Sequence, residues 1–390
     1  MKISLNIQPM LHSSKSGIGY YQQEMINALL RLDKNNEYCL QYFDPSGKHE
    51  KTAAGLALPN VTINCCRLIS ATLYHLIWSV IPLPYSLFFR NSADITAFFN
   101  YYLPPFAKGK KVLMVYDTVV KDCPGTMNFH TKAMLKLTLG RSIKRADRII
   151  TISEFSKQQI IKHYHADPKK ICVIPCAANR NRFYPIEDKT VICRKTAEKY
   201  GISGEYYLYL GTLEPRKNIL KLIEAYALAL SEKPDIPLLV IAGGKGWLYE
   251  DIFRRTEELG LTDKVIFTGY LSDDDVPVLM NGAAAFCFPS LYEGFGMPPL
   301  EAMSCGTPVI VSNTTSLPEV MGECGLQTDP NDADQISHAL LKVLEKEEAE
   351  RQSLMGLERA EHFSWDKNAV SLLRLFEELC YEQNTDPADK

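Results

Sequence analysis

Two glutamates late in the chain are separated by seven residues, in the stretch Glu293-Gly-Phe-Gly-Met-Pro-Pro-Leu-Glu301. The apolar run 285–288 before them predicts a strand, and the two prolines suit the first turn of a helix, where a missing N–H costs little. The N–H groups of Gly296 and Met297 should then point outward at the positive end of that helix, where anions bind. Two carboxylates can also hold hydroxyls. The stretch therefore predicts a site for a ligand that is both anionic and rich in hydroxyls.

Two adjacent cations, Arg216 and Lys217, follow a predicted strand at 206–210 and a turn that begins with Gly211. We expect them in the first turn of a helix that reaches Leu230, where positive charge opposes the helix dipole. Sequences depart from such local preferences most often at functional sites, where another interaction offsets the cost. An anion held between this helix start and the two side chains would remove the penalty, so the pair predicts a phosphate site.

Glycines follow two further predicted strands. Gly17 and Gly19 lie between a strand at 2–8 and a helix predicted from residue 20 to residue 32. A strand, a glycine-rich loop and a helix in this order present backbone amides to a phosphate, although many such loops hold glycine for turning alone. Gly243 follows the predicted strand 238–242 and begins a loop whose backbone can approach a ligand closely.

A strand predicted at 112–115 ends in Tyr116 and Asp117. An aspartate at the carboxyl end of a strand can contact a substrate or cap the next turn, and the sequence leaves both roles open. The Tyr116 hydroxyl can form hydrogen bonds but cannot act as a base near neutral pH.

Strands and helices alternate along the chain and then restart, which predicts an α/β fold with two parallel sheets. The 390 residues suffice for two domains with full cores. The alternation breaks at the irregular segment 179–188. We therefore expect one domain at 1–180, a second at 181–365, and a C-terminal helix at 366–390.

The charge is unevenly distributed. Residues 1–185 hold 24 Lys and Arg against 11 Asp and Glu, whereas the rest of the chain holds 19 against 35. A basic half predicts attraction to an anionic membrane surface or a phosphate-bearing substrate, or it is simply a solvated surface. Residues 68–89 contain no Asp, Glu, Lys or Arg. Because they contain two prolines and several polar residues, we expect a buried helix rather than a membrane span, with a membrane-touching surface as the alternative.

The Glu293–Glu301 element resembles the signature of retaining nucleotide-sugar glycosyltransferases of the GT-B fold, family 4. The likeness is closest over 206–330, weaker over 111–175 and weakest over 36–100. It implies two Rossmann-like, doubly wound parallel-sheet domains that face a central cleft. The first domain would bind the acceptor, the second would bind the nucleotide-sugar donor, and the C-terminal helix would cross back onto the first domain.

The resemblance also implies roles for particular residues. Glu293, Asp117, Arg216 and Lys217 would form the catalytic group, with the two cations on the donor phosphates. Tyr116 stands where the family usually has a histidine near the transferred sugar, so it becomes an acceptor-side candidate. The expected donor contacts come from the glycine loops, the nucleobase-lining residues and the signature itself: Gly17, Gly19, Gly211, Gly243, Tyr270, Leu271, Phe295, Gly296, Met297, Pro298 and Glu301.

The implied reaction moves a sugar from a nucleotide diphosphate to a hydroxyl with the anomeric configuration kept. The motif Gly-Thr-Leu-Glu-Pro-Arg-Lys-Asn at 211–218 resembles the mannosyl-transferring branch, which implies GDP-mannose; UDP-glucose or a UDP-N-acetylhexosamine stays open. Retaining glycosidases use a second carboxylate as nucleophile. Nothing in the sequence places one, so we favour same-face attack assisted by the leaving phosphate.

We expect a glycan or a lipid-linked acceptor, as in surface polysaccharide or glycolipid synthesis, and peripheral contact with an anionic membrane. No nucleic acid, metal or resident cofactor is expected, since no metal-ligand spacing is visible. The unpatterned cysteines predict reduced thiols and hence the cytoplasm, with the inner face of the membrane as the alternative location. The rival interpretations are another GT-B enzyme, such as an epimerase or phosphorylase, and a nucleotide-sugar binding protein without catalysis.

Overall fold

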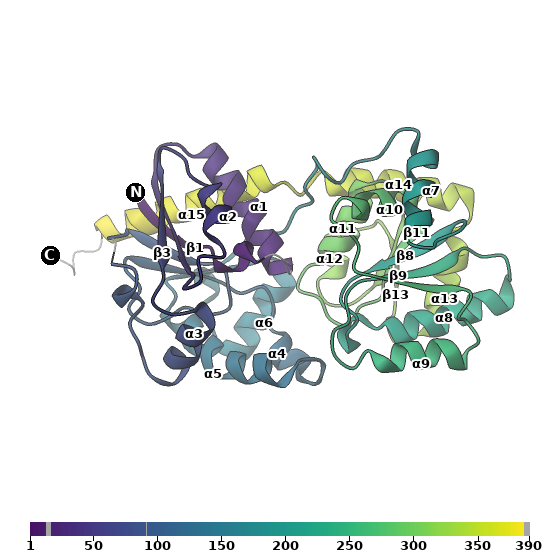
Figure 1. Ribbon diagram of the computed structural model, residues 1–390, viewed down its shortest axis with the longest axis horizontal. Helices are drawn as coiled ribbons and strands as arrows, with labels where there is room; N and C mark the ends of the chain where they lie inside the picture. Colours follow the sequence, from purple (N-terminus) through teal and green to yellow (C-terminus); the bar gives the residue numbers. More distant parts are fainter. Residues whose placement is uncertain (13–16, 91, 386–390) are drawn as a thin grey trace. The chain divides into compact units, whose positions relative to one another are not determined.

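The computed structural model describes residues 1–12, 17–90 and 92–385, and the chain divides into two compact units. Unit 1 comprises Met1–Cys176 together with the segment that starts at Trp365, and unit 2 comprises Ala177–Ser364. Each unit has a parallel β-sheet with helices on both faces (Figure 1). The predicted fold class, two Rossmann-like parallel-sheet domains, is therefore confirmed.

The sheet of unit 1 has the strand order β3-β2-β1-β4-β5-β6-β7, and every pairing is parallel. The order reverses between β1 and β4, so these neighbours diverge at their carboxyl ends and leave room for a ligand there. Ile3 of β1 pairs with Tyr38 on one side and Ile95 on the other. The strands are β1 Lys2–Asn6, β2 Glu37–Phe43, β3 Val61–Cys66, β4 Ile95–Phe98, β5 Lys110–Met114, β6 Arg148–Thr151 and β7 Ile171–Val173.

Helices α1 and α15 lie on one face of this sheet in Figure 1, and α3, α5 and α6 lie on the other. The bounds are α1 Gly17–Leu32, α2 Glu50–Ala54, α3 Ala71–Val80, α4 Val119–Asp122, α5 Phe129–Arg145, α6 Glu154–Tyr164 and α15 Trp365–Thr385. The 3₁₀ turns of the unit are η1 Gln8–Leu11, η2 Tyr85–Leu87, η3 Pro124–Thr126 and η4 Pro168–Lys170.

The C-terminal helix α15 packs on α1, although more than 300 residues of chain separate them. The Trp365 ring meets the Tyr21 ring edge-on at 5.2 Å, and Asn368 donates a hydrogen bond of 2.7 Å to the carbonyl of Pro175. An ion pair joins Arg31 to Asp366. Buried aromatic contact and a hydrogen-bonded amide therefore attach this helix to unit 1.

The sheet of unit 2 has the order β10-β9-β8-β11-β12-β13, again with parallel pairing throughout. Its order reverses between β8 and β11, which is where ligands bind in doubly wound sheets. The strands are β8 Tyr206–Leu210, β9 Leu238–Ala242, β10 Val265–Gly269, β11 Ala285–Phe288, β12 Val309–Ser312 and β13 Leu326–Thr328.

In Figure 1, α8, α9 and α13 cover one face of this sheet, and α7, α10, α11 and α12 lie on the other. The bounds are α7 Lys189–Lys199, α8 Ile219–Glu232, α9 Glu250–Glu258, α10 Asp275–Gly282, α11 Met297–Ser304, α12 Leu317–Met321, α13 Ala333–Lys342 and α14 Lys346–Ala360. The 3₁₀ turn η5 spans Pro215–Lys217.

The structure corrects three local expectations. Gly17 and Gly19 belong to α1 itself, which begins at Gly17; residues 13–16 of the expected loop lie outside the described residues. Helix α3 is not buried, because only Tyr74, Trp78 and Ser79 are covered while Leu76 and Val80 are 53% and 78% exposed. Its apolar residues surround the helix, so one face must meet solvent once the other has packed.

The third correction concerns the two cations. Arg216 and Lys217 lie in the 3₁₀ turn η5, before Asn218, and not inside helix α8. Asn218 adopts a left-handed conformation with φ of 58°, a backbone geometry that asparagine tolerates better than most residues. The turn therefore ends before the helix begins, and the cations avoid the unfavourable first-turn position.

Candidate active site

The candidate site of unit 2 lies at the reversal of its sheet. The segments that follow β8 and β11 carry Arg216 and Glu293, and these two strands are neighbours. The carboxyl ends of adjacent parallel strands meet at one edge of a sheet. The topology thus brings together side chains that lie 77 residues apart in sequence.

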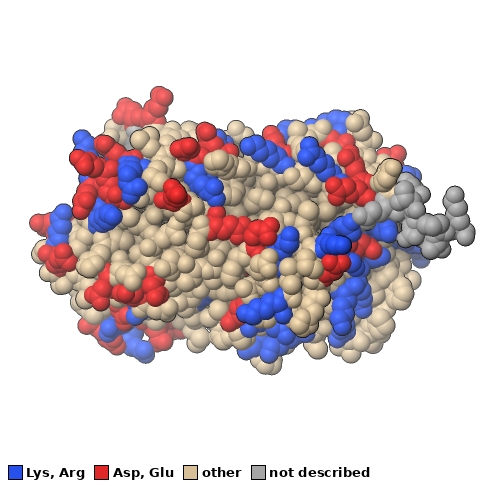
Figure 2. Space-filling model, turned by 180° about the vertical axis from the view of Figure 1, so that it is seen from behind, with Lys and Arg blue, Asp and Glu red and all other residues tan. Residues whose placement is uncertain are grey.

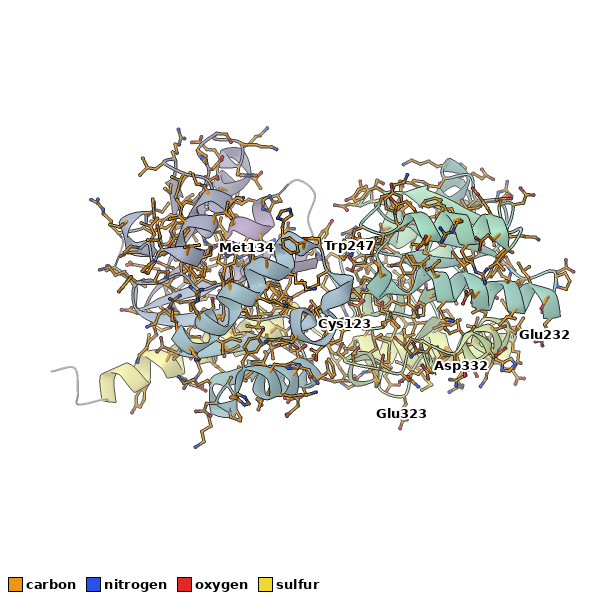
Figure 3. The ribbon with its side chains drawn as sticks, turned by 90° about the horizontal axis from the view of Figure 1, so that it is seen from below. Cys123, Met134, Glu232, Trp247, Glu323 and Asp332 are labelled. Atoms are coloured by element: carbon orange, nitrogen blue, oxygen red, sulfur yellow. The ribbon has the colours of Figure 1, made fainter. Side chains whose placement is uncertain are left out.

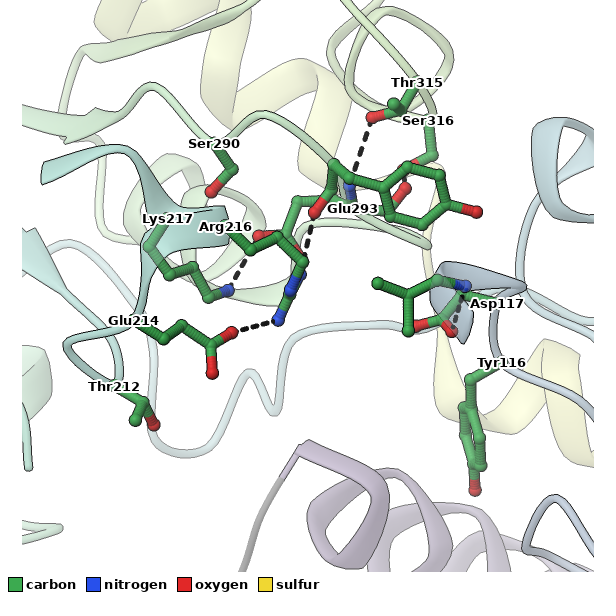
Figure 4. Close-up of polar contacts among 12 residues, drawn as sticks. Tyr116, Asp117, Thr212, Glu214, Arg216, Lys217, Ser290, Glu293, Thr315 and Ser316 are labelled. Atoms are coloured by element: carbon green, nitrogen blue, oxygen red, sulfur yellow. Dashed lines mark hydrogen bonds and ion pairs between the residues drawn. The ribbon is translucent and has the colours of Figure 1, made fainter. Parts of the chain in front are cut away.

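The two cations and two carboxylates form one ion-pair cluster (Figure 4). Lys217 Nζ lies 2.7 Å from Glu293 Oε1, and Arg216 Nη1 lies 3.0 Å from Glu293 Oε2. The other guanidinium nitrogen, Nη2, lies 2.7 Å from Glu214 Oε1. The side chains are only 7–19% exposed, so the two positive and two negative charges largely neutralise one another away from solvent.

Burial and neighbouring charges shift the pKa of Glu293 in opposite directions. Burial alone would raise the pKa of this carboxyl, but Arg216 and Lys217 outweigh it and lower the pKa to about 2. Burial also lowers the pKa of Lys217, with the charge of Arg216 adding to the effect and that of Glu293 opposing it. Glu293 is therefore ionised throughout the neutral range and can accept hydrogen bonds, but it cannot serve as an acid.

Backbone contacts fix the position of this cluster. Arg216 Nη1 donates to the Tyr292 carbonyl at 2.7 Å, and the Leu291 N–H donates to the Arg216 carbonyl at 2.9 Å. The Asn218 side-chain amide donates to the carbonyls of Pro289 and Pro330 at 3.0 and 2.6 Å. The turn that carries both cations is thus bonded to the loops after β11 and β13.

The backbone of Glu293 is held from the other side by the segment after β12. Its N–H donates to the Thr315 hydroxyl at 3.2 Å, and its carbonyl accepts from the Ser316 hydroxyl at 2.9 Å (Figure 4). The following Gly296 has a φ of 106°, and a Cβ there would come within 2.6 Å of the Leu317 side chain. Glycine is required at this point for the chain to enter α11.

Two of the glycines expected to contact the donor have a clear packing role. A Cβ on Gly243, whose φ is 140°, would lie 1.9 Å from the Gly211 carbonyl oxygen. The ends of β8 and β9 therefore approach each other more closely than any side chain would permit. Contact of these glycines with the donor stays a prediction.

The remaining expected donor contacts have different environments within unit 2. Tyr270 is 66% exposed, whereas Leu271 and Phe295 are buried, and the Phe295 ring meets Phe363 edge-on at 5.6 Å. Met297 begins α11, followed by Pro298, one residue earlier than the sequence predicts. Glu301 lies on the same helix. Phe295 is thus a core residue, and only its backbone is suited to meeting a ligand.

In unit 1, Tyr116 and Asp117 follow β5. The Tyr116 ring is buried against Tyr21 and Tyr101, and its hydroxyl donates to the Phe99 carbonyl at 3.1 Å. Burial raises the pKa of this phenol well above its usual value. Asp117 accepts a 3.1 Å hydrogen bond from the N–H of Val119 at the start of α4. Both residues have structural partners here, and their roles toward an acceptor stay predictions.

Sequence reasoning missed two residues of the unit 2 cluster. Glu214 completes the charge balance around Arg216, and Asn218 ties the turn to two other loops. An asparagine directly after two cations was a usable signal for a left-handed residue that ends a turn. No sequence signal pointed to Glu214, because its pairing with Arg216 depends on the conformation of the turn.

No group of three or more His, Cys, Asp and Glu side chains is arranged to hold a metal ion among the residues that the structure describes. Within the same part of the chain, no helix is both long and apolar enough to cross a bilayer.

Comparisons with known proteins identify the family of this chain. Residues 16–182 match the model "Glycosyltransferase Family 4", and residues 195–355 match "Glycosyl transferases group 1". Over 285 residues the chain is 37% identical to O-antigen chain mannosyltransferase B of Escherichia coli, covering 71% of this chain and 72% of that protein.

Two further similarities agree. The chain is 36% identical over 266 residues to the serotype-specific mannosyltransferase WbdA of Escherichia coli, covering 67% of this chain but only 32% of that protein's length. A sucrose-phosphate synthase structure from Thermosynechococcus elongatus superposes with a TM-score of 0.75 at 20% identity, covering 97% of this chain and 99% of that one. The chain belongs to the GT-B glycosyltransferases of family 4 and to their mannosyltransferase-like branch.

Proposed function

We propose that this glycosyltransferase moves mannose from GDP-mannose to a hydroxyl of a glycan or lipid-linked acceptor in surface polysaccharide synthesis. The relatives named as O-antigen and serotype-specific mannosyltransferases support the sugar and the process. The donor is assigned to unit 2 and the acceptor to unit 1. A UDP-sugar donor is the alternative that the experiments below separate from this one.

The observation that carries the proposal is the buried cluster of Arg216, Lys217 and Glu293 at the reversal of the unit 2 sheet. Departure of a nucleoside diphosphate leaves negative charge on the leaving oxygen. Two cations held in a largely desolvated turn can stabilise that charge without reorganising, which lowers the barrier to bond cleavage. Asn218 and the Tyr292 carbonyl keep the turn in place before the donor arrives.

Glu293 has two functions in this proposal. Its ionised carboxylate orients Lys217 and Arg216 in the absence of donor, and it accepts hydrogen bonds from the sugar hydroxyls once the donor is bound. A carboxylate that is already ionised and paired with two cations is a poor nucleophile. Retention is therefore assigned to same-face attack, in which the leaving phosphate takes the proton of the acceptor hydroxyl.

The acceptor is assigned to a pocket of about 900 Å³ at the carboxyl edge of the unit 1 sheet. Its walls come from η1 after β1, from the loop after β4, and from helices α3 and α5; Met134 on α5 is labelled in Figure 3. Tyr101 and Tyr102 supply aromatic faces, and Gln8 and Asn100 supply hydrogen-bonding groups. Aromatic faces with a few polar groups suit the apolar faces and hydroxyls of a sugar ring.

Peripheral contact with an anionic membrane is part of the proposal. Large apolar side chains on α3 and the residue after it are exposed: Leu73, Leu76, Val80 and Ile81. Figure 2 shows Lys and Arg side chains gathered on the face of unit 1 that it displays. Exposed apolar side chains and a basic surface on the same unit each favour contact with an anionic lipid surface. Co-sedimentation with anionic vesicles at low ionic strength tests the membrane contact. Absence of binding would refute that contact but not the proposed transfer reaction.

The test of the reaction is the release of nucleoside diphosphate from donor and acceptor together. GDP-mannose should give GDP only when an acceptor glycan is present, and UDP-glucose should give far less UDP. Donor binding without product release would instead indicate a binding protein. Thermal shift with GDP, UDP and their sugars gives an independent reading, because a ligand that binds the native state raises its apparent stability.

A further inference from the structure

We propose that unit 1 carries a separate anion site, a groove between α5 and α6 that binds the phosphate of a ligand other than the donor. The groove has a volume of about 830 Å³ and is lined by five Lys and Arg side chains and two histidines, with Asp167 as the one carboxylate among the described residues that line it. The cations are Lys121, Lys136, Arg141, Lys144 and Lys170. A recess with this balance of charge concentrates anions.

None of these five cations has a carboxylate partner among the residues that the structure describes. Arg141 donates to the Ser79 carbonyl at 3.0 Å, and Lys121 lies over the Tyr164 ring at 5.7 Å. The Asp167 carboxylate already accepts from the Lys169 N–H at 3.0 Å. Like charges gathered without counter-charges repel one another, and an anion in the groove would relieve that repulsion.

Interaction with helix C-termini does not account for the cluster. Lys144 lies in the last turn of α5, and His163 lies in the last turn of α6, where positive charge is favourable. His163 already contacts Asp122 at 2.6 Å. Lys136 and Arg141, however, precede the last turn of α5, and Lys170 belongs to η4. Lys121 lies in the last turn of the short helix α4, so helix C-termini account for at most two of the five cations, which come from several elements and converge on this groove.

The floor of the groove is apolar and open enough for more than a bare ion. Ile143, Ile149 and Tyr164 line it, and Gly140 of α5 faces the Tyr164 ring. A Cβ on Gly140 would meet that ring at 3.7 Å, an ordinary contact, so the missing side chain leaves the groove open without any backbone need for glycine. The ligand class is therefore a phosphate mono- or diester that carries an organic group.

The groove can be tested apart from the donor phosphate site, because all its residues belong to unit 1, whereas the cluster of Arg216, Lys217 and Glu293 belongs to unit 2. In a Lys217→Ala background, which weakens the donor site, pyrophosphate is titrated by calorimetry at low ionic strength. We expect binding that Lys144→Gln with Lys170→Gln weakens about tenfold. Lys48→Gln with Lys51→Gln, the same charge change on exposed residues of unit 1 outside the groove, should leave the affinity unchanged.

Gly140→Leu gives a second variant that fills the groove and changes no charge. It should weaken pyrophosphate binding, whereas Gly140→Ala should have little effect. The proposal is overturned if the Lys217→Ala protein does not bind pyrophosphate, or if the groove variants bind it as tightly as the Lys48 and Lys51 control. Circular dichroism of each variant establishes that folding is intact.

Vesicles separate the two sources of the phosphate. If the ligand is a lipid headgroup, vesicles of equal parts phosphatidylcholine and phosphatidylglycerol should bind the protein, with pyrophosphate competing and the groove variants binding less. If the ligand is a free phosphorylated molecule, pyrophosphate should bind, and the groove variants should bind vesicles as well as the wild type does. Failure of the donor proposal would appear in a different measurement, as equal GDP affinity of the wild type and Lys217→Ala.

Discussion

Lys217 Nζ and Glu293 Oε1 lie 2.7 Å apart, although 76 residues of sequence separate them. The carboxylate of Glu293 also holds Arg216, so the two cations assigned to the donor phosphates are paired before any donor is present. An arriving diphosphate must share these cations with Glu293. Several consequences of this relationship can be measured.

The first prediction separates donor binding from catalysis at Glu293. Glu293→Gln keeps the size of the side chain but removes the negative charge that competes with the diphosphate. GDP affinity should stay the same or rise, while the rate of sugar transfer should fall by about a hundredfold or more because the sugar loses an ionic acceptor. Calorimetry with GDP and a GDP-release assay give the two readings. Weaker GDP binding together with normal transfer would contradict this account.

A second prediction concerns acid stability. The pKa of Glu293 is lowered from an ordinary value of 4.5 to about 2. Its ion pairs therefore contribute stability that is present above about pH 4.5 and is lost as the pH falls toward 2. In Glu293→Gln the free energy of unfolding should therefore depend less steeply on pH. Loss of one titrating proton reduces that slope by up to about 1.4 kcal/mol per pH unit.

Urea unfolding of wild type and Glu293→Gln at several pH values between 5 and 3, monitored for unit 2, checks this. The variant should also be less stable near neutral pH by about 3 kcal/mol, because two buried cations lose a partner. Parallel pH profiles for the two proteins would show that the carboxyl is not held ionised by its neighbours.

His75 provides a third prediction, in unit 1. Its ring centroid lies 3.8 Å from that of Tyr102, and its buried Nε2 has no hydrogen-bond partner among the residues that the structure describes. Burial lowers its pKa to about 4. The unfolded chain binds a proton there below about pH 6.5, and the folded chain does not until about pH 4, so stability falls as the pH decreases through this range.

His75→Phe should reduce that loss and leave the stability at pH 7 within about 1 kcal/mol of wild type, because an aromatic ring of similar shape is kept. Thermal unfolding between pH 7 and pH 4 makes the comparison. The expectation is wrong if the variant and wild type lose stability equally over that interval.

The glycine pair after β9 gives a fourth prediction with a built-in control. Gly243→Ala places a Cβ 1.9 Å from the Gly211 carbonyl oxygen, whereas a Cβ on the adjacent Gly244 meets nothing within 4 Å. Gly243→Ala should destabilise unit 2 by about 3 kcal/mol or more, and Gly244→Ala should have an effect below about 1 kcal/mol. Chemical unfolding of the two single variants measures this. Equal stability of both would mean that β8 and β9 do not approach so closely.

Much of the fold could be predicted from the sequence. Strands β8 and β9 have the bounds that the sequence predicts, 206–210 and 238–242, and the Ser153 hydroxyl caps α6 through a 3.0 Å hydrogen bond from the Ser156 N–H. Apolar periodicity and capping residues act over a few positions, so they can be read locally. The two parallel sheets follow from the alternation of strands and helices, whereas their doubly wound arrangement was implied by the family resemblance.

The detailed arrangement of the site could not be predicted in this way. Asn218 is a local signal for the end of the turn that carries Arg216, but its bonds to Pro289 and Pro330 in other loops cannot be read from the sequence. The exposure of Leu76 and Val80 on α3 likewise depends on which face packs. Long-range partners of this kind are set by tertiary packing, and local propensity carries no information about them.

The central claim is that the turn carrying Arg216 and Lys217 neutralises the donor diphosphate. Calorimetric titration of GDP into wild type, Lys217→Ala and Lys221→Ala measures this most directly, since Lys221 is a partly exposed lysine of the same unit that pairs with Glu224. GDP should bind to wild type and Lys221→Ala alike and about thirtyfold more weakly to Lys217→Ala. Equal affinity of all three proteins for GDP, or no binding to wild type, would contradict the account.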